Sequence, residues 1–404
     1  MRIFYIHQYF KTPEEGGGIR SYYLAKAMAQ SGHHVDLFTG YEGTKYKKTF
    51  VDGIHVHYLP VRYAQSFGFL GRVRSFLKFV ALVILKTRDF AKPDFCYVSS
   101  TPLTTGLIGL YLRWHRQVPY YFEVRDLWPE APIQLGVLKS AILKKLLYRL
   151  EKTIYQQAKA VIALSPGARD YISNRVPGKE VLMIPNMSDC GFFSKTEKNP
   201  YHKLQYEVSG KFVITYFGAV GKVNRLQHLL DAARACQEQQ LHDVAFLVAG
   251  EGSELSKIKD TSEKFGLKNI RFVPFQNKYG LLSVLNVTDA VYVSFMDLPV
   301  LQHCSPNKLF DALAAGKLCI STLPGWMQHM LEENHCGFYT NPAVPQDFVK
   351  QIAAFVNDAG LLETYQNNAR ALAEEQFSRQ QQAAAVLALI EGKPAEVRAY
   401  TLPV

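Results

Sequence analysis

Residues 305–321 read SPNKLFDALAAGKLCIS, and this stretch combines a helix start with a short apolar run. Ser305 followed by Pro306 is typical of a helix start, with the serine as N-cap and the proline as the first helical residue. The apolar run 318–321 follows this helix and predicts a short buried strand. A helix that leads into a short buried strand indicates a parallel α/β sheet.

Both halves of the chain alternate short apolar runs with helix-like stretches. In the first half, strands are expected at residues 2–7, 34–39, 54–59, 95–99, 120–124 and 160–164, and helices at 19–31, about 68–86 and 138–158. In the second half, strands are expected at residues 212–217, 244–249, 270–273, 290–294 and 318–321, with helices between them. This alternation predicts an α/β fold of two Rossmann-like, doubly wound domains that face each other across a cleft.

The length supports the same division, because 404 residues exceed what one hydrophobic core usually organises. The polar stretch 194–210 is expected to link an N-terminal domain, residues 1–195, to a C-terminal domain, residues 205–376. The final helix, about 379–391, is expected to pack back on the N-terminal domain.

The composition is that of a folded globular enzyme, which argues against a disordered or low-complexity chain. The net charge of +11 indicates an anionic partner, which is nucleic acid, an anionic membrane surface or a phosphorylated substrate. Six scattered cysteines without a CxxC pair favour a reducing cytoplasm over a disulfide framework or a zinc site. We expect neither a signal peptide at the N-terminus nor a spanning helix, because the apolar run 79–85 is too short.

A glycine cluster joins the first strand to the first helix, in the sequence EEGGGIR at residues 14–20. Glycines allow the backbone to approach a ligand closely, and the helix start that follows favours an anion. Gly17 and Gly18 are therefore candidate donor-binding residues, and Arg20 is a candidate contact of the acceptor or sugar. A flexible turn explains the glycines equally well.

The sequence EVRDLWPE, residues 123–130, follows a predicted buried strand. Charged residues gathered at the carboxyl end of a strand suit a cleft better than a core. Arg125 is predicted to hold an anion or orient a carboxylate, and Asp126 or Glu130 to bind sugar hydroxyls. The alternative is an internal Arg–Glu pair that fixes the loop.

Two glycine turns in the second half predict a nucleotide site. GAVGKVNR, residues 218–225, and AGEGS, residues 249–253, follow successive strands. Such turns before a helix cradle phosphates through their backbone N–H groups. The candidate donor-binding residues are Gly218, Lys222, Gly250 and Glu251.

The helix start at 305–316 is the most specific of these segments. Lys308 and the first N–H groups of the helix point at one place and form a trap for an anion. Asp311 lies one turn further on and is suited to bind two ribose hydroxyls. The donor-binding residues predicted from this helix start are Ser305, Asn307, Lys308, Leu309 and Asp311.

The chain resembles the bacterial glycosyltransferases of family 4, which have the GT-B fold, and above all their WbuB-like subgroup of O-antigen and capsule enzymes. The similarity runs nearly end to end through SSTPLTTGLIGL, FEVRDLWPEAPIQLG, ALSPG, IPNMSDCGFF, YFGAVGK, SPNKLFDALAAGK and EENHCGFYTNP. The resemblance implies a retaining transfer from a nucleotide-sugar, with the donor bound by the second domain and the acceptor by the first. By analogy with the subgroup, the donor is UDP-linked and its sugar an N-acetylated 6-deoxyhexose.

The resemblance also implies roles for single residues. Asp311 matches the second glutamate of the family's E-x7-E motif and would hold the ribose, while Lys308 would meet the diphosphate. Arg125 and Asp126 match the family's His-Asp pair at the donor sugar, and Gly16–Gly18 match the loop near the phosphates. Arg125, Asp126 and Lys308 form the predicted catalytic set.

Three positions depart from the family pattern. His303 stands at the first glutamate of E-x7-E, Asp311 shortens the second, and Arg125 replaces a histidine. His303 either lies beside the sugar or is an ordinary surface histidine. Lys222 is the nearest candidate for the family's phosphate-binding Arg/Lys pair.

No DxD sequence is present, so we expect no metal and no other cofactor, with Lys308 and helix-terminal N–H groups stabilising the departing diphosphate. Front-face attack by the acceptor hydroxyl is the expected route to retention.

The basic, apolar stretch 68–88, GFLGRVRSFLKFVALVILKTR, predicts a helix that lies on an anionic membrane surface. In residues 139–152 the apolar stripe is expected to face the core. Together with the positive charge, the first helix favours a polyprenyl-diphosphate-linked saccharide as acceptor and a cytoplasmic enzyme at the inner face of the membrane. The alternatives are a nucleotide-sugar epimerase, a nucleic-acid-binding protein, for which no recognition motif is present, and a sugar-binding module without activity.

Overall fold

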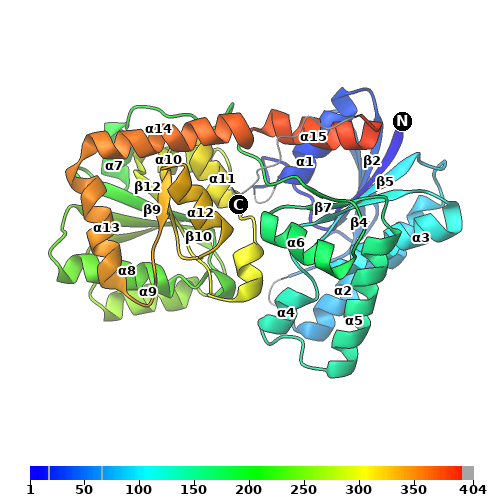
Figure 1. The fold of residues 1–404 in the computed structure, drawn as a ribbon, viewed down its shortest axis with the longest axis horizontal. Coiled ribbons are helices and arrows are strands. Elements are labelled where there is room, and N and C mark those ends of the chain that lie inside the picture. The colour runs from blue at the N-terminus through cyan, green and yellow to red at the C-terminus, as the bar shows by residue number, and fades with distance from the viewer. Residues whose placement is uncertain (17–18, 65–66, 394–404) are drawn as a thin grey trace.

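The computed structural model describes residues 1–16, 19–64 and 67–393, and these form two α/β lobes (Figure 1). The first lobe holds β1 (Arg2–Ile6), β2 (His34–Tyr41), β3 (Lys47–Val51), β4 (Ile54–Pro60), β5 (Phe95–Ser99), β6 (Tyr120–Val124), β7 (Val161–Ala163) and β8 (Val181–Met183). Its helices are α1 (Arg20–Gln30), α2 (Phe69–Thr87), η1 (Leu103–Thr105), α3 (Gly106–Arg116), α4 (Glu130–Gln134), α5 (Ala141–Gln157) and α6 (Pro166–Arg175). The strand order is β3-β4-β2-β1-β5-β6-β7-β8, parallel except for β3.

The second lobe holds a parallel sheet in the order β11-β10-β9-β12-β13-β14. Its strands are β9 (Phe212–Ala219), β10 (Val244–Glu251), β11 (Ile270–Val273), β12 (Ala290–Val293), β13 (Leu318–Ser321) and β14 (Gly337–Tyr339). The helices of this half are α7 (Pro200–Gln205), η2 (Lys222–Asn224), α8 (Gln227–Glu238), α9 (Leu255–Lys264), α10 (Gly280–Val287), η3 (Pro299–His303), α11 (Asn307–Ala314), α12 (Trp326–Glu333), α13 (Pro345–Asn357), α14 (Ala359–Gln376) and α15 (Arg379–Glu391).

The central strands of each sheet are buried on both faces, which is why they are nearly continuous apolar runs. In β1, Ile3 and Tyr5 face the core that includes α1 and α15, while Phe4 and Ile6 face the core that includes α2 and α3. All four side chains are fully buried. Helices therefore cover both faces of each sheet, and the predicted doubly wound GT-B architecture is confirmed.

The C-terminal helix returns to the first lobe. Figure 1 shows α14 along the second lobe and α15 continuing in the same direction over α1. Val386 and Ile390 of α15 pack into the core of the first lobe with Tyr5 of β1. Helix α15 (Arg379–Glu391) has the bounds that the sequence analysis expected for the final helix.

The structure differs from the sequence prediction in several places, and α3, α4 and α6 of the first lobe are among the elements that were not predicted. The sequence did not predict β3, β8 and β14, and the expected linker 194–210 contains the short helix α7. Ser305 is not the N-cap of α11, because the helix begins at Asn307 and Pro306 occupies the N-cap position. The carbonyl of Ser305 is held by the side-chain amide of Asn186 at 2.5 Å, so the chain enters the helix one residue later than predicted.

Candidate functional site

A cavity of about 660 Å³ lies between the lobes, at the carboxyl ends of strands from both sheets. Ligands of doubly wound folds bind in this position. Of the predicted site residues, Arg20, Gly218, Glu251, Asn307, Lys308 and Asp311 line it. Gly17 and Gly18 lie outside the described residues, although Gly16 lines the cavity.

The two glycine turns of the second lobe meet because β9 and β10 pair in register. Gly250 lies opposite Gly218, and Glu251 lies opposite Ala219. A Cβ on Gly250 would lie 2.0 Å from the carbonyl oxygen of Gly218, so only glycine allows this approach. Gly218 has a φ of +104°, which also favours glycine. Gly250 thus packs against the backbone of the Gly218 turn, while Gly218 and Glu251 line the cavity.

The amine of Lys308 is buried at the start of α11 and has no hydrogen-bond partner among the described residues. It lies 3.7 Å from the centroid of the Tyr216 ring, in a cation–π contact, and near Gly218. Burial lowers the pKa of Lys308 to about 7. The hydroxyl of Ser305 is likewise buried without a partner in the described part of the chain. Buried donors of this kind require an anion or another polar group to satisfy them.

Asp311 lines the cavity one turn beyond Lys308. Burial raises its pKa to about 7, an effect that the positive charge of Lys278 partly offsets. Burial thus favours the protonated form of this carboxyl.

Lys278 is a cavity residue that the sequence analysis missed. Its amine forms an ion pair with Asp189 and donates a hydrogen bond to the hydroxyl of Tyr23 at 2.6 Å. Arg379 of α15 also pairs with Asp189, at 2.9 Å. These contacts join α1, the chain between the lobes, the segment after β11, and α15. Lys278 stands alone in the sequence PFQNKYG, where no pattern indicates its partners.

Arg20 lines the cavity but has a structural role. It pairs with Glu123 at 2.8 Å and donates hydrogen bonds to the carbonyls of Ile184 and Pro185. Both charged side chains are almost fully buried. Burial raises the pKa of Glu123, but the positive charges of Arg20 and Arg125 more than offset this and lower it to about 2. The guanidinium of Arg20 is thus held by groups of the protein itself, and its predicted contact with the acceptor or sugar stays a prediction.

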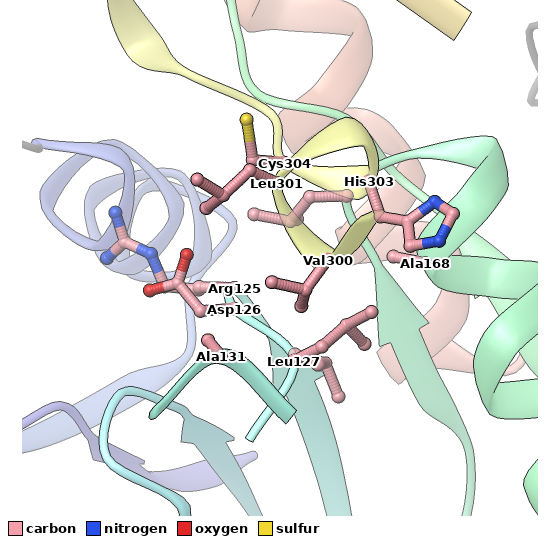
Figure 2. Close-up of a pocket in the computed structure, with 11 residues that line it drawn as sticks. Arg125, Asp126, Leu127, Ala131, Ala168, Val300, Leu301, His303 and Cys304 are labelled. Atoms are coloured by element: carbon pink, nitrogen blue, oxygen red, sulfur yellow. The ribbon is translucent and has the colours of Figure 1, made fainter. Parts of the chain in front are cut away.

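Arg125, Asp126 and His303 gather around a second, small pocket of about 20 Å³ between the lobes. Figure 2 shows Arg125 and Asp126 on one side of this pocket and His303 on the other. Arg125 contacts the ring of His7 at 3.2 Å, and Asp126 accepts a hydrogen bond from Thr101 at 2.9 Å. These three predicted residues are therefore grouped together, apart from the residues that line the larger cavity.

Glu130 is also removed from the larger cavity. Its carboxylate accepts hydrogen bonds from Gln134, at 2.8 Å, and from the hydroxyl of Tyr148. Both partners come from the first lobe, so Glu130 joins α4 to α5. The predicted contact with sugar hydroxyls has no support in this geometry.

Two predicted donor-binding residues of the second lobe are placed elsewhere. The side chain of Leu309 is fully buried in the core, and its N–H is bonded to the carbonyl of Pro306 at 3.1 Å. Lys222 lies in η2 with an exposed side chain, outside the residues that line the cavity. Neither residue contacts the cavity in this structure.

A search of the described residues finds no group of three or more His, Cys, Asp or Glu side chains that could hold a metal ion. Metal independence of the reaction remains a prediction.

Both halves of the chain match models of known protein families. Residues 15–187 match the model of the glycosyl transferase 4-like domain, and residues 198–372 match that of the glycosyl transferases group 1. The two matches cover the two lobes one after the other. The chain therefore combines a glycosyl transferase 4-like domain with a glycosyl transferases group 1 domain, which is consistent with glycosyltransferase family 4.

Curated relatives are bacterial. A putative colanic acid biosynthesis glycosyl transferase, WcaI of Escherichia coli K12, is 23% identical over 52% of this chain and 51% of its own length. The probable glycosyltransferase WbjE of Pseudomonas aeruginosa is 24% identical over 68% of this chain and 69% of its own. The chain thus spans about half the length of WcaI and about two thirds of WbjE.

Solved structures share the fold at low identity. Sucrose-phosphate synthase from Thermosynechococcus elongatus superposes with a TM-score of 0.77 at 17% identity, covering 97% of this chain and 98% of that one. HepE of Anabaena, solved with UDP and glucose, gives 0.71 at 19% identity over 97% and 99% of the chains. WaaG, a glycosyltransferase involved in lipopolysaccharide biosynthesis, gives 0.68 at 15% identity over 97% and 100%.

The buried ion pair of Arg20 and Glu123 leads to a prediction about the stability of the protein. In Arg20→Met the carboxylate of Glu123 loses its counter-charge, so urea unfolding should show a loss of about 3–5 kcal/mol. Adding Glu123→Gln to this variant should restore part of the stability, because it removes the buried charge. The partly exposed Arg169, changed to Met, is the matched control and should shift stability by less than about 0.5 kcal/mol. An Arg20→Met protein of normal stability would contradict the structural role.

Proposed function

We propose that the protein is a retaining, metal-independent glycosyltransferase of bacterial surface polysaccharide biosynthesis. It moves a sugar from a UDP-linked donor to a polyprenyl-diphosphate-linked saccharide, at the cytoplasmic face of the membrane. The observation that carries the proposal is the buried amine of Lys308, which faces the interlobe cavity without a counter-charge among the described residues. A diphosphate supplies the charge that this amine lacks.

The donor is proposed to lie against the second lobe. Lys308 and the N–H groups at the start of α11 bind the diphosphate, and Asp311 accepts hydrogen bonds from the ribose. The turns at Gly218 and Glu251 complete the phosphate side of the cavity. HepE was solved with UDP-glucose and with UDP, and a trehalose-6-phosphate enzyme from E. coli with UDP-2-fluoro glucose, which supports a uridine donor.

The chemical step breaks the anomeric C–O bond, and its electron pair leaves with the nucleoside diphosphate. Positive charge fixed at the leaving phosphate lowers this barrier most. Lys308 supplies that charge without a metal ion. The acceptor hydroxyl attacks from the same face, and its proton passes to an oxygen of the leaving phosphate, which retains the anomeric configuration. Arg125 and Asp126 are proposed to orient the reacting sugars from the first lobe.

The first lobe carries an exposed apolar and basic surface that suits an anionic membrane. Its exposed apolar side chains are Phe69, Leu70, Leu77 and Leu85 of α2, and Val137, Ile142 and Leu146 on and just before α5. Both helices lie on the lower side of the first lobe in Figure 1. Exposed basic residues Arg74, Lys78, Lys139 and Lys145 accompany them. Such surfaces lie in the bilayer interface and hold anionic lipid.

This surface corrects the expectation that the apolar stripe of residues 139–152 faces the core. Ile142 is 76% exposed and Leu146 is 59% exposed. Within this stretch Leu150 packs against the core, and beyond it the core takes Ile154 and Tyr155 from the end of α5. None of the helices in the described ranges combines the length and apolarity needed to cross a bilayer.

Turnover of the two substrates tests the proposed reaction. With a UDP-sugar and a polyprenyl-diphosphate-linked saccharide, UDP should be released only in the presence of the acceptor, and equally in EDTA. Nuclear magnetic resonance should show the donor's anomeric configuration in the product. Conversion of the donor alone would indicate an epimerase, and a strict need for Mg²⁺ or Mn²⁺ would exclude the metal-free mechanism.

Changing Lys308 to Met should weaken UDP binding by about 10- to 100-fold, because a charged hydrogen bond to the diphosphate is lost. Calorimetric titration with UDP measures the loss. Lys222→Met is the matched control, since it removes the same charge outside the cavity and should bind UDP as the unaltered protein does. Equal binding by both variants would remove the basis of the proposal.

Proton uptake gives a second test of Lys308. Its pKa of about 7 in the empty site should rise when a diphosphate binds, because the anion favours the charged amine. Below pH 7 the amine is already charged, whereas at pH 8 binding of UDP should take up roughly one proton. UDP affinity should therefore fall as the pH rises above 7. Titrations in buffers of different ionisation enthalpy measure the uptake, which Lys308→Met should abolish.

Charge reversal tests the membrane surface. Arg74→Glu with Lys78→Glu should weaken binding to anionic vesicles by at least about 30-fold, since each lost basic residue contributes about 1 kcal/mol. Co-sedimentation measures the change. The same two-charge reversal at Lys257 and Lys259 of α9, on the second lobe, should leave vesicle binding unaltered. Equal effects of both pairs would show that net charge alone is responsible.

A further inference from the structure

Three side chains of the first lobe hold the main chain of one short segment of the second. The segment, residues 300–305, contains most of η3 and leads into α11. The three contacts, here named the main-chain bracket, are Gln134 Oε1 with the N–H of Val300 at 3.0 Å, Ser165 Oγ with the carbonyl of His303 at 2.5 Å, and Asn186 Nδ2 with the carbonyl of Ser305 at 2.5 Å.

The two carbonyl contacts are shielded from water. Ser165 is fully buried and Asn186 is 2% exposed. Loss of either donor would leave a carbonyl in this interface without its partner, which costs more than loss of an exposed hydrogen bond. Both residues lie outside the set that lines the larger cavity, so they act on a ligand there only through other groups.

Two residues of the sequence ALSPG, residues 163–167, make this contact possible. The hydroxyl of Ser165 accepts a hydrogen bond from the N–H of Ala168 at 3.1 Å, which caps α6, and donates one to the carbonyl of His303. A Cβ on Gly167 would lie 2.1 Å from Nδ1 of His303. A glycine at 167 therefore allows the His303 ring to lie against α6.

The bracket ends three residues before Lys308. The carbonyl of Ser305 is its last anchored group, and α11 begins two residues later. Further along α11, the carbonyl of Phe310 is held by the hydroxyl of Ser188 at 2.8 Å. Main-chain positions on both sides of Lys308 are thus fixed by residues of the chain before the second lobe.

We propose that Ser165 and Asn186 are positioning residues for the donor, which hold the chain before α11 so that the amine of Lys308 faces the cavity. The inference rests on the proposed function, because it assumes a diphosphate at Lys308. The diphosphate site is then complete only when the two lobes are in contact. Ser165 and Asn186 act through Lys308 and do not touch the donor.

A double-mutant cycle tests the proposal, with UDP affinity measured by calorimetry. Ser165→Ala should weaken UDP binding about tenfold in the otherwise unaltered protein, and less than twofold in the Lys308→Met background. A general loss of stability would weaken binding equally in both backgrounds, and that result would overturn the proposal. Asn186→Ala repeats the cycle at the second anchor, and either residue suffices if the other variant fails to fold.

Two variants separate the bracket from the helix cap. Ser140 caps α5 through the N–H of Leu143 at 3.4 Å and contacts no residue of the second lobe in the described chain, so Ser140→Ala should bind UDP normally. Ser165→Thr keeps the hydroxyl and should restore binding to within about twofold of the unaltered protein. A loss in Ser140→Ala equal to that in Ser165→Ala would assign the effect to capping and overturn the proposal.

The same titrations distinguish a failure of the main-chain bracket from a failure of the proposed function. If the unaltered protein binds UDP and Ser165→Ala binds it as tightly, the bracket is wrong and the proposed function stands. If the unaltered protein binds no UDP while it remains folded, the proposed donor is wrong and the inference falls with it.

Discussion

The ion pair between Arg20 and Glu123 lies within the first lobe and fixes the turn from which the chain reaches the second lobe. It joins α1 to β6, and the same guanidinium holds the carbonyls of Ile184 and Pro185, where the chain leaves the first sheet. The two residues that follow in contact with the second lobe, Asn186 and Ser188, are placed by this turn. A buried pair of this kind is weak evidence for stability, but losing one partner is costly, which keeps the turn in one conformation.

Of the three lysines that line the cavity, Lys278 and Lys308 differ in the groups that surround their amines. Lys278 has its counter-charge in Asp189 and a hydroxyl partner in Tyr23. The amine of Lys308 has two aromatic rings near it and no hydrogen-bond partner among the described residues. Burial lowers the pKa of both, but only Lys308 is left without an acidic partner to restore it. The amine of Lys278 thus has its partners within the protein, whereas that of Lys308 has no hydrogen-bond partner among the described residues.

Sequence patterns predicted features formed by residues close together in the sequence and missed contacts between residues far apart in it. Lys308 and Asp311 share a helix start, so their common cavity follows from spacing alone, as does the alternation of strands and helices. The Arg20–Glu123 pair spans 103 residues and the Lys278–Asp189 pair 89, and no local pattern connects such partners. The edge strand β3 is polar and largely exposed, so it lacks the apolar run by which the other strands were found. Periodicity could not decide which side of α5 meets the core.

The chain passes between the lobes twice, and the two crossings lie together. The first follows β8, and the second is the junction between α14 and α15. They are tied by a backbone bridge between Ser188 and Ser378 and by the ion pair of Asp189 with Arg379. Two covalent connections fastened at one edge resist sliding and twisting of the lobes and leave rotation about that edge as the easiest movement. The double crossing is therefore the axis about which the lobes can rotate. Such a rotation would break contacts between the lobes, including the one that Ser165 makes in the main-chain bracket.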